Sequence, residues 1–183
     1  RVMKKIRNNH EDIYPAGPGY VRAIRAGDML FISGTTARNS DAQGGPPMDQ
    51  LRVVLDRITR CVAAEGGKPS DIVKLTTYVT DRSVWWPIEG EQVEIFEEFF
   101  AGEYPTNAIV EVSGLAEDGL DIEIEAIAVV GATGVSKESI DPLEMTKPEH
   151  HAMLVRVGNT VYISGLCAWD PDGKLIGVAD AEG

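Results

Sequence analysis

The segment from Leu120 to Val130 constrains the fold of this chain more than any other stretch. It has the sequence LDIEIEAIAVV, and it alternates polar and apolar residues in steps of two, which is typical of a strand buried on one face. Asp121, Glu123 and Glu125 therefore project to one side, and the isoleucines tend toward the other. A shorter β-branched run, Asn107–Val112, precedes it, and glycine and acidic residues fill the turn. We predict a hairpin with one packed face and one face of carboxylates.

Glu123 is the carboxylate that we single out as a candidate catalytic residue. It lies in mid-strand, opposite the arm that begins with Pro105 and contains Asn107. The Asn107 carboxamide can both donate and accept hydrogen bonds, so the two side chains can share a small cleft that holds a polar ligand. The carboxylates of Asp121 and Glu125 are more simply explained as a solvated strand face.

The preceding residues predict an ordered series of strands and helices. Apolar residues recur at helical spacing after Asp49, and the strand at 72–80 is rich in β-branched residues. The order ββαβαββ predicts an α+β fold, a two-layer sandwich with both helices on one face of a mixed sheet. The predicted elements are strands at 20–25 and 29–33, a helix from 49 that Gly66-Gly67 ends, a strand at 72–80, a second helix interrupted early by Pro87, and the two arms of the hairpin.

The chain then begins this pattern again. The segment GDMLFISGTT at 27–36 is echoed by GNTVYISGLC at 158–167, at a displacement of 131 residues. His151 then corresponds to Tyr20, and Ser164-Gly165 corresponds to Ser33-Gly34. We predict a complete domain at 1–131, an exposed polar linker at 132–148, and the opening hairpin of a second, incomplete copy at 149–183.

A lone hairpin is marginally stable in water, so the second copy needs a partner. Two explanations fit. Either the chain is a piece of a longer tandem polypeptide whose remainder lies in another chain, which we favour, or the hairpin docks onto an existing sheet.

Several of these segments resemble the Rid family, the reactive intermediate deaminases that are also called YjgF proteins. The resemblance rests on YPTNAIVEV and IEIEAIAVV in the predicted hairpin, on PGYVRAIRAGDMLFISG at 18–34 and on DIVKLTTYVTD at 71–81, and it covers nearly all of residues 15–131. It implies a chorismate-mutase-like fold with ligand clefts between neighbouring subunits. The assembly that it implies is a homotrimer or a trimer of tandem copies, and a further chain could carry the rest of the second copy.

The resemblance also implies hydrolysis of an imine or enamine. In the family, a glutamate on the last strand positions the attacking water, and an arginine two residues after the proline binds the substrate carboxylate. The glutamate matches Glu123, but Asn107 stands where the family has the arginine. That substitution removes a charged, bidentate group, so we expect Asn107 to hold a neutral imine, or one whose carboxylate is bound elsewhere.

Five further residues match positions of the family cleft. Tyr20 matches the cleft tyrosine, although its hydroxyl could equally cap a core position. Ser33 and Gly34 match the strand end where the backbone approaches the ligand. Trp85 matches an aromatic residue of the cleft wall, although a tryptophan that opens an amphipathic helix is typical of a core. Ile109 occupies a position that is often cysteine, so this cleft has no thiol.

The composition excludes several classes of function. A formal net charge of −12 repels a nucleic-acid backbone, and no apolar run is long enough to cross a membrane. Cys61 and Cys167 form neither a metal-binding pattern nor a disulfide framework, which suits the cytoplasm, and Cys61 is expected in the core. His150 and His151 are adjacent and have no third ligand at a recognisable spacing, so we expect no metal and no cofactor.

Two functions from different classes fit the sequence. The first is hydrolytic deamination of a small imine or enamine, with water positioned by Glu123 and substrate held by Asn107 and Tyr20. The alternative is a catalytically silent ligand-binding or scaffold subunit of the same fold.

Overall fold

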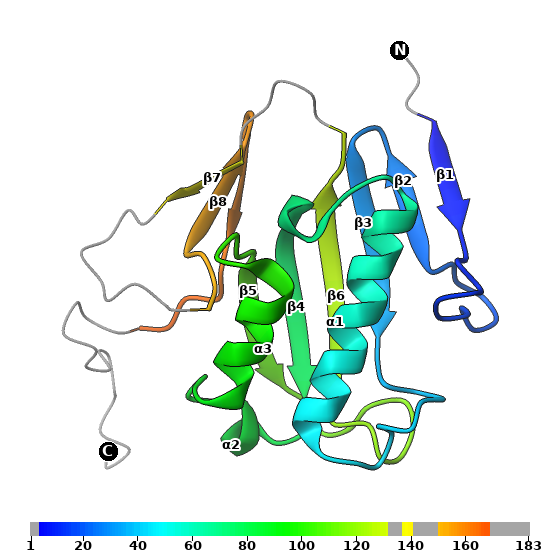
Figure 1. Ribbon diagram of the computed structural model, residues 1–183, viewed down its shortest axis with the longest axis vertical. Helices are drawn as coiled ribbons and strands as arrows, with labels where there is room; N and C mark the ends of the chain where they lie inside the picture. The colour runs from blue at the N-terminus through cyan, green and yellow to red at the C-terminus, as the bar shows by residue number, and fades with distance from the viewer. Residues whose placement is uncertain (1–3, 132–136, 141–149, 169–183) are drawn as a thin grey trace, which may run out of the picture.

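A six-stranded mixed sheet lies at the centre of the computed structural model, which describes residues 4–131, 137–140 and 150–168 (Figure 1). Strands β4 and β5 are parallel, and the other neighbours are antiparallel. In spatial order the strands are β1 (Lys5–Asn8), β2 (Ala23–Ala26), β3 (Met29–Thr35), β6 (Ile122–Val129), β4 (Ile72–Val79) and β5 (Thr106–Glu111).

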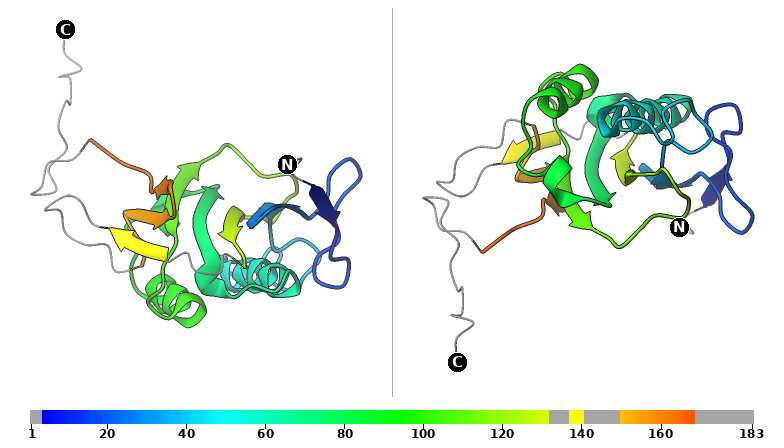
Figure 2. Two further views of the ribbon diagram at one scale, coloured as in Figure 1. Left: turned by 90° about the horizontal axis from the view of Figure 1, so that it is seen from above. Right: turned by 90° about the horizontal axis from the view of Figure 1, so that it is seen from below.

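The two long helices, α1 (Pro47–Ala64) and α3 (Glu91–Phe100), cover one face of this sheet (Figure 2). A 3₁₀ turn, η1 (Pro69–Asp71), leads into β4, and a short helix, α2 (Arg82–Trp85), precedes α3. This is the predicted two-layer α+β sandwich. Gly66 at φ 81 follows the end of α1, and the break between α2 and α3 contains Pro87, as the sequence predicted.

The main core lies between these helices and the sheet. Leu55 and Ile58 of α1 are fully buried, as are Ile122 and Ile124 of β6. Cys61 also lies in this core, and burial raises the pKa of its thiol to about 11, so the predicted structural role of Cys61 is confirmed. None of the helices in the described residues is long and apolar enough to cross a bilayer.

The predicted hairpin at 107–130 is wrong in its pairing, although both of its strands exist. β6 lies between β3 and β4, and β4 separates it from β5. The connection from 112 to 121 is longer than the roughly two to five residues of a tight hairpin, so its turn residues do not fix the partner of either strand. In the central position β6 has hydrogen-bonded neighbours on both edges.

The hairpin at 154–163 has the same register as the first hairpin, at 23–32. β8 (Leu154–Val157) pairs with β9 (Thr160–Ile163) in a register displaced by 131 residues from that of β2 with β3. The Ser164 hydroxyl donates to the Ala152 carbonyl at 2.6 Å, as the Ser33 hydroxyl donates to the Val21 carbonyl at 2.8 Å. The two hairpins therefore correspond in register and in this hydrogen bond, and a second copy of the domain stays a prediction.

The repeated hairpin docks onto the first domain, which was the second of the two explanations offered by the sequence. Strand β5 is an edge strand, and its outer edge is covered by residues that follow β9. The backbone amide of Asn107 donates to the Ser164 hydroxyl at 3.0 Å, and the backbone amide of Gly165 donates to the backbone carbonyl of Asn107 at 2.9 Å. We call this contact between Asn107, Ser164 and Gly165 the β5 seam.

Apolar and cationic contacts extend the docking. Val155 and Tyr162 pack against Val73 of β4, on the sheet face that lacks helices.

A further strand, β7 (Lys137–Ile140), lies inside the predicted linker and pairs with β8. The Lys137 ammonium donates to the carbonyls of Ser70, Ile72 and Glu103. Part of the predicted exposed linker is therefore structured. The remaining linker positions and residues 169–183 lie outside the described residues, and the domain boundaries stay a prediction.

We predict that Ser164→Ala weakens the β5 seam. The Asn107 amide loses its acceptor, and one hydrogen bond contributes about 1 kcal/mol, so exchange of that amide should accelerate about fivefold. Hydrogen exchange measured by NMR tests this. Ser33→Ala is the matched control, because Ser33 has the same intrahairpin bond and should leave the Asn107 amide unchanged. Equal exchange in both variants would contradict the seam.

Candidate active site

Gly34 and Glu123 are in direct contact on the face of the sheet that lacks helices. The pairing of β3 with β6 is irregular between Ile32 and Thr35, and such bulges redirect side chains near functional sites. A Cβ atom added to Gly34 would overlap Oε1 of Glu123. Glycine at this position leaves space for the carboxylate, which a larger residue would displace.

Arg22 connects the residues around this contact, and the sequence analysis missed it. The side chain is fully buried, and Nη1 donates to the Gly34 carbonyl at 2.7 Å. Nη2 donates to the Tyr20 hydroxyl at 3.1 Å. Nothing in the local sequence separates Arg22 from an exposed arginine on a strand, because its burial depends on contacts with distant residues.

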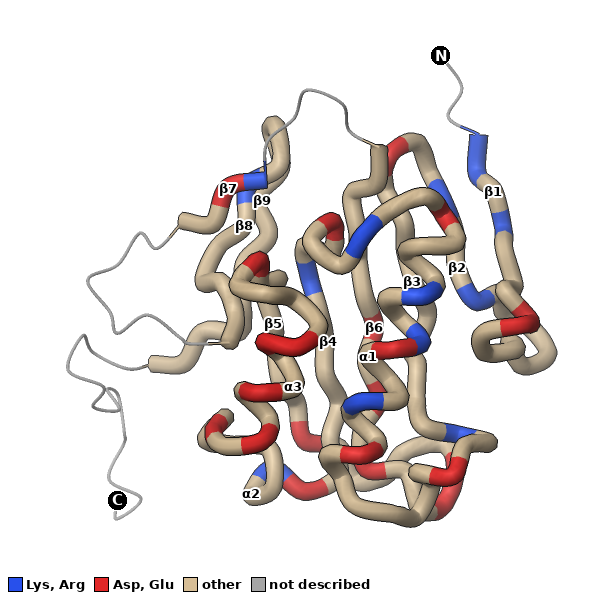
Figure 3. The backbone as a smooth tube through the Cα atoms, in the orientation of Figure 1, with Lys and Arg blue, Asp and Glu red and all other residues tan. Residues whose placement is uncertain are grey.

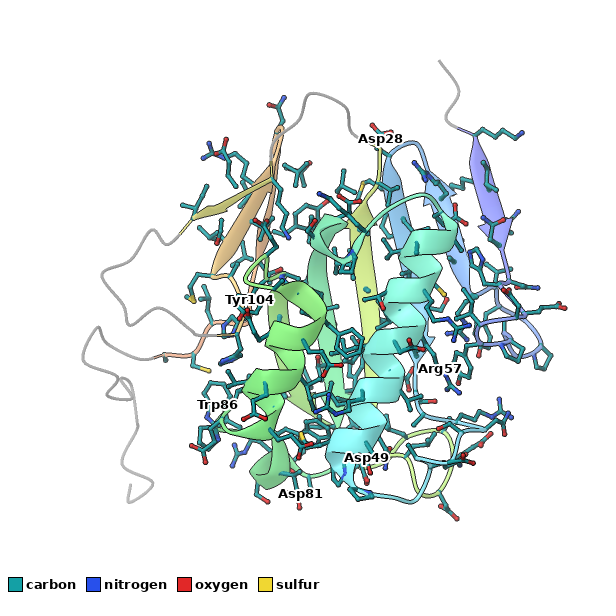
Figure 4. All side chains as sticks on the ribbon, in the orientation of Figure 1. Asp28, Asp49, Arg57, Asp81, Trp86 and Tyr104 are labelled. Carbon is teal, nitrogen blue, oxygen red and sulfur yellow. The ribbon has the colours of Figure 1, made fainter. Side chains whose placement is uncertain are left out.

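The Arg22 guanidinium also stacks against aromatic rings. Its central carbon lies 4.3 Å from the centre of the Tyr14 ring, and the guanidinium of Arg57 lies 4.2 Å from the same ring. Arg57 extends from α1 (Figure 4), and burial lowers its pKa. Two buried cations thus contact one ring, and cation–π contacts contribute about 2 kcal/mol when they are desolvated.

These bonds define what Tyr20 and Ser33 can offer a ligand. Arginine has no acceptor, so the Tyr20 oxygen accepts from Arg22, and its own proton is free to be donated. The Ser33 hydroxyl already donates to Val21, so toward a ligand it acts as an acceptor. The site therefore presents a donor at Tyr20 and an acceptor at Ser33.

An open pocket of about 500 Å³ lies beside these two residues. Tyr20 is 45% exposed, so its hydroxyl is accessible from this pocket. We call it the Tyr20 pocket, and it is lined by Arg7, Gly19, Tyr20, Val21, Ile24 and Ser33.

The carboxyl group of Glu123 is partly buried, and its pKa is raised. Burial is the largest cause, and repulsion by the Glu125 carboxylate adds to it. The positive charge of Arg22 acts in the opposite direction and lowers the pKa. A carboxylate whose pKa is raised is a stronger base, which suits proton transfer from water.

Asn107 does not share a cleft with Glu123 within this chain, which corrects the sequence prediction. Asn107 is paired with Leu75 and Glu123 with Tyr78, and residues three apart on a strand point to opposite faces. Asn107 is 5% exposed, and its Oδ1 accepts from the Thr77 hydroxyl at 2.9 Å. The prediction failed because it assumed that β5 and β6 were paired.

Trp85 and Ile109 also lie away from the Tyr20 pocket. Trp85 is 1% exposed in the main core, so a ligand in the cleft cannot reach it, and its prediction as a cleft residue is wrong. Ile109 packs against the same core. Tyr20, Ser33, Gly34 and Glu123 are the predicted site residues that the structure brings together.

His150 lies beside α3, and the His151 ring is 4.8 Å from the His150 ring. His150 packs edge-on against Phe96, with ring centres 6.3 Å apart, and burial lowers its pKa to about 4. Within the described residues, no group of three His, Cys, Asp or Glu side chains could hold a metal ion.

Comparison with known proteins identifies relatives of the chain. A family model described as "Endoribonuclease L-PSP" matches residues 10–130. A RutC family protein of Pyrococcus horikoshii is 36% identical over 69% of this chain and 98% of its own length. The 2-iminobutanoate/2-iminopropanoate deaminase of Escherichia coli is 38% identical over 63% of this chain and 91% of its own length.

The fold matches that of solved relatives. The crystal structure of a Mycobacterium tuberculosis member of the YjgF/YER057c/UK114 family superimposes with a TM-score of 0.58 at 31% identity. The match covers 69% of this chain and all of the other. The expected Rid-type fold is thereby confirmed.

We predict that Glu123→Gln stabilises the protein near neutral pH. The pKa of Glu123 is higher in the folded than in the unfolded state, so the folded protein favours the neutral carboxyl group. This contribution to the stability of the protein is fully present below the unfolded pKa and is lost as the pH rises through the folded pKa. The glutamine variant lacks this loss, and its Tm should exceed that of the wild type at pH 7 and approach it near pH 4.

Thermal unfolding across this pH range tests the prediction. Glu89→Gln makes the same chemical change at an exposed position and should show a much smaller effect. A Glu123→Gln variant that is less stable than the wild type at pH 7 would show that the carboxylate is held by favourable contacts.

Proposed function

The chain belongs to the endoribonuclease L-PSP family, also known as the YjgF or Rid family, and from this premise we propose that it hydrolyses small imines or enamines. The observation that carries the proposal is the Glu123 carboxylate against Gly34, whose carbonyl is bonded by the same Arg22 guanidinium that bonds the Tyr20 hydroxyl. The name of the Escherichia coli relative, 2-iminobutanoate/2-iminopropanoate deaminase, supports the same reaction class.

In the proposed reaction Glu123 acts as general base. It takes a proton from water as the water oxygen bonds to the imine carbon, and it then gives this proton to the nitrogen. The hydroxyl proton of the resulting carbinolamine is transferred to the amino nitrogen, the C–N bond breaks, and ammonia leaves as the C=O bond of a ketone or aldehyde forms. An enamine first becomes the imine by gaining a proton on carbon and losing one from nitrogen. The raised pKa of Glu123 favours the first proton transfer.

Tyr20 and Ser33 orient the substrate in this proposal. The free Tyr20 proton is donated to an acceptor of the substrate, and the Ser33 oxygen accepts from its nitrogen. Arg22 acts through these groups, because it fixes the Tyr20 hydroxyl and the Gly34 carbonyl while remaining buried. It is therefore a positioning residue.

Asn107 has no part in the cleft of Glu123 in this proposal. It lies on the opposite face of the sheet, and Ser164 and Gly165 cover the edge of its strand. Its role is to hold the β5 seam through its backbone.

The proposal does not extend to RNA cleavage, despite the description of the family model. A net charge of −12 repels phosphates.

We also propose that separate copies of this domain associate in the way that the hairpin of β8 and β9 docks, by packing a hairpin on the sheet face that lacks helices. Val155 and Tyr162 are buried at the docking contact, whereas the equivalent Phe31 of the first copy is 40% exposed. The exposed side of β2 and β3 therefore fits a surface like that of β4 and β6 on another lobe. The trimer implied by the family resemblance stays a prediction, and within this chain the β5 edge is already used.

We predict that Glu123→Gln lowers kcat/KM for imine hydrolysis about a hundredfold or more, since the variant cannot accept a proton from water. Ammonia release from imines of 2-oxo acids and from neutral imines, each generated in situ, measures the reaction. Glu125→Gln is the matched control, because Glu125 is an exposed carboxylate on the same strand face, and turnover should fall only severalfold.

Equal ammonia release by the wild type and Glu123→Gln, at the spontaneous rate, would overturn the proposal. Stabilisation by a ligand without turnover would then favour the alternative, a silent ligand-binding or scaffold subunit.

A further inference from the structure

We propose that Arg7 of β1 binds the carboxylate of the ligand in the Tyr20 pocket. This inference rests on the proposed function and narrows its substrates to acidic imines and enamines. The chemistry that it assigns is recognition of a small carboxylate by a guanidinium at the rim of the pocket.

The position of Arg7 follows from strand pairing. Arg7 is directly opposite Ile24 in the antiparallel pair of β1 and β2, so both side chains lie on the same face. That face carries the Tyr20 pocket, which both residues line. Arg7 is exposed, and its guanidinium makes no hydrogen bond or ion pair with another described residue, so its donors are available to a ligand.

Arg7 supplies the charge that the other residues of the pocket lack. Of the residues that line the pocket, Arg7 is the charged one. Arg22 is fully buried and its guanidinium is bonded to Tyr20 and to the backbone of Gly34, so it cannot contact a ligand. The protein carries a net charge of −12, so an anionic ligand needs a local cation.

The remaining polar groups complement an imino acid. Arg7 and the Tyr20 hydroxyl are donors that suit carboxylate oxygens, and guanidinium binds carboxylate with two parallel hydrogen bonds. The Ser33 oxygen is an acceptor that suits an N–H group. A ligand with a carboxylate next to an imine carries both kinds of group within a few bonds.

Basic residues lie along β1 (Figure 3), which is an edge strand of the sheet. Positive charges on an edge strand also discourage aggregation, so they can have a role that is unrelated to the pocket. The test must therefore separate charge at the pocket from charge on the strand. Lys5 allows this, since it lies two residues before Arg7 on the same face but does not line the pocket.

The experiment compares the binding of 2-oxobutanoate with that of its uncharged amide, 2-oxobutanamide, by NMR titration. Arg7→Gln should raise the Kd for the acid about fivefold to tenfold and leave that for the amide unchanged. Arg7→Lys should retain part of the affinity, since it keeps the charge but loses the bidentate geometry. Lys5→Gln should change neither Kd by more than about twofold.

Equal losses for acid and amide in Arg7→Gln, or equal effects of Arg7→Gln and Lys5→Gln, would overturn the inference. Wild-type protein that binds neither compound would also overturn it. The proposed function fails separately: binding that depends on Arg7 without any turnover would refute hydrolysis and leave the inference standing. Turnover of acidic imines with a KM that is the same in Arg7→Gln as in the wild type would refute the inference and leave hydrolysis standing.

Discussion

The site depends on one close contact, the carboxylate of Glu123 against the bare backbone of Gly34. A side chain at position 34 would displace the carboxylate, and the irregularity in β3 creates the space. Arg22 holds the other side of this contact, because it bonds the Gly34 carbonyl from within the protein and attracts the Glu123 carboxylate. Burial of Glu123 disfavours its charged form, so the arrangement keeps a basic carboxylate at some cost in stability near neutral pH.

Most of the fold could be predicted from periodicity. The alternation in β6 and the helical spacing in α1 are local patterns, and the structure has a strand and a helix at those positions. The partner of β6 could not be predicted, because the connection that precedes it is too long to fix a neighbour. This single error placed Asn107 beside Glu123, whereas the two side chains lie on opposite faces of the sheet.

The candidate site was predictable only in part for a similar reason. Tyr20, Ser33, Gly34 and Glu123 come from segments that the family resemblance marks, and the fold brings them together. Arg22 and Arg7 carry no such mark. Whether an arginine on a strand is buried, solvated or at the rim of a pocket depends on the strands on either side of it, which the local sequence does not show. Trp85 illustrates the converse, since an aromatic residue that suits a cleft wall is equally suited to the core that it occupies.

The chemistry at Glu123 is independent of the Asn107 carboxamide, whose residue holds the β5 seam through its backbone, and the kinetics of Asn107→Ala test this independence most directly. The substitution removes the carboxamide but keeps the backbone groups that bond Ser164 and Gly165. If the account is right, kcat/KM for hydrolysis of a 2-imino acid stays within about threefold of the wild-type value. A loss as large as that caused by removing the Glu123 carboxylate would contradict it and would return Asn107 to the catalytic cleft.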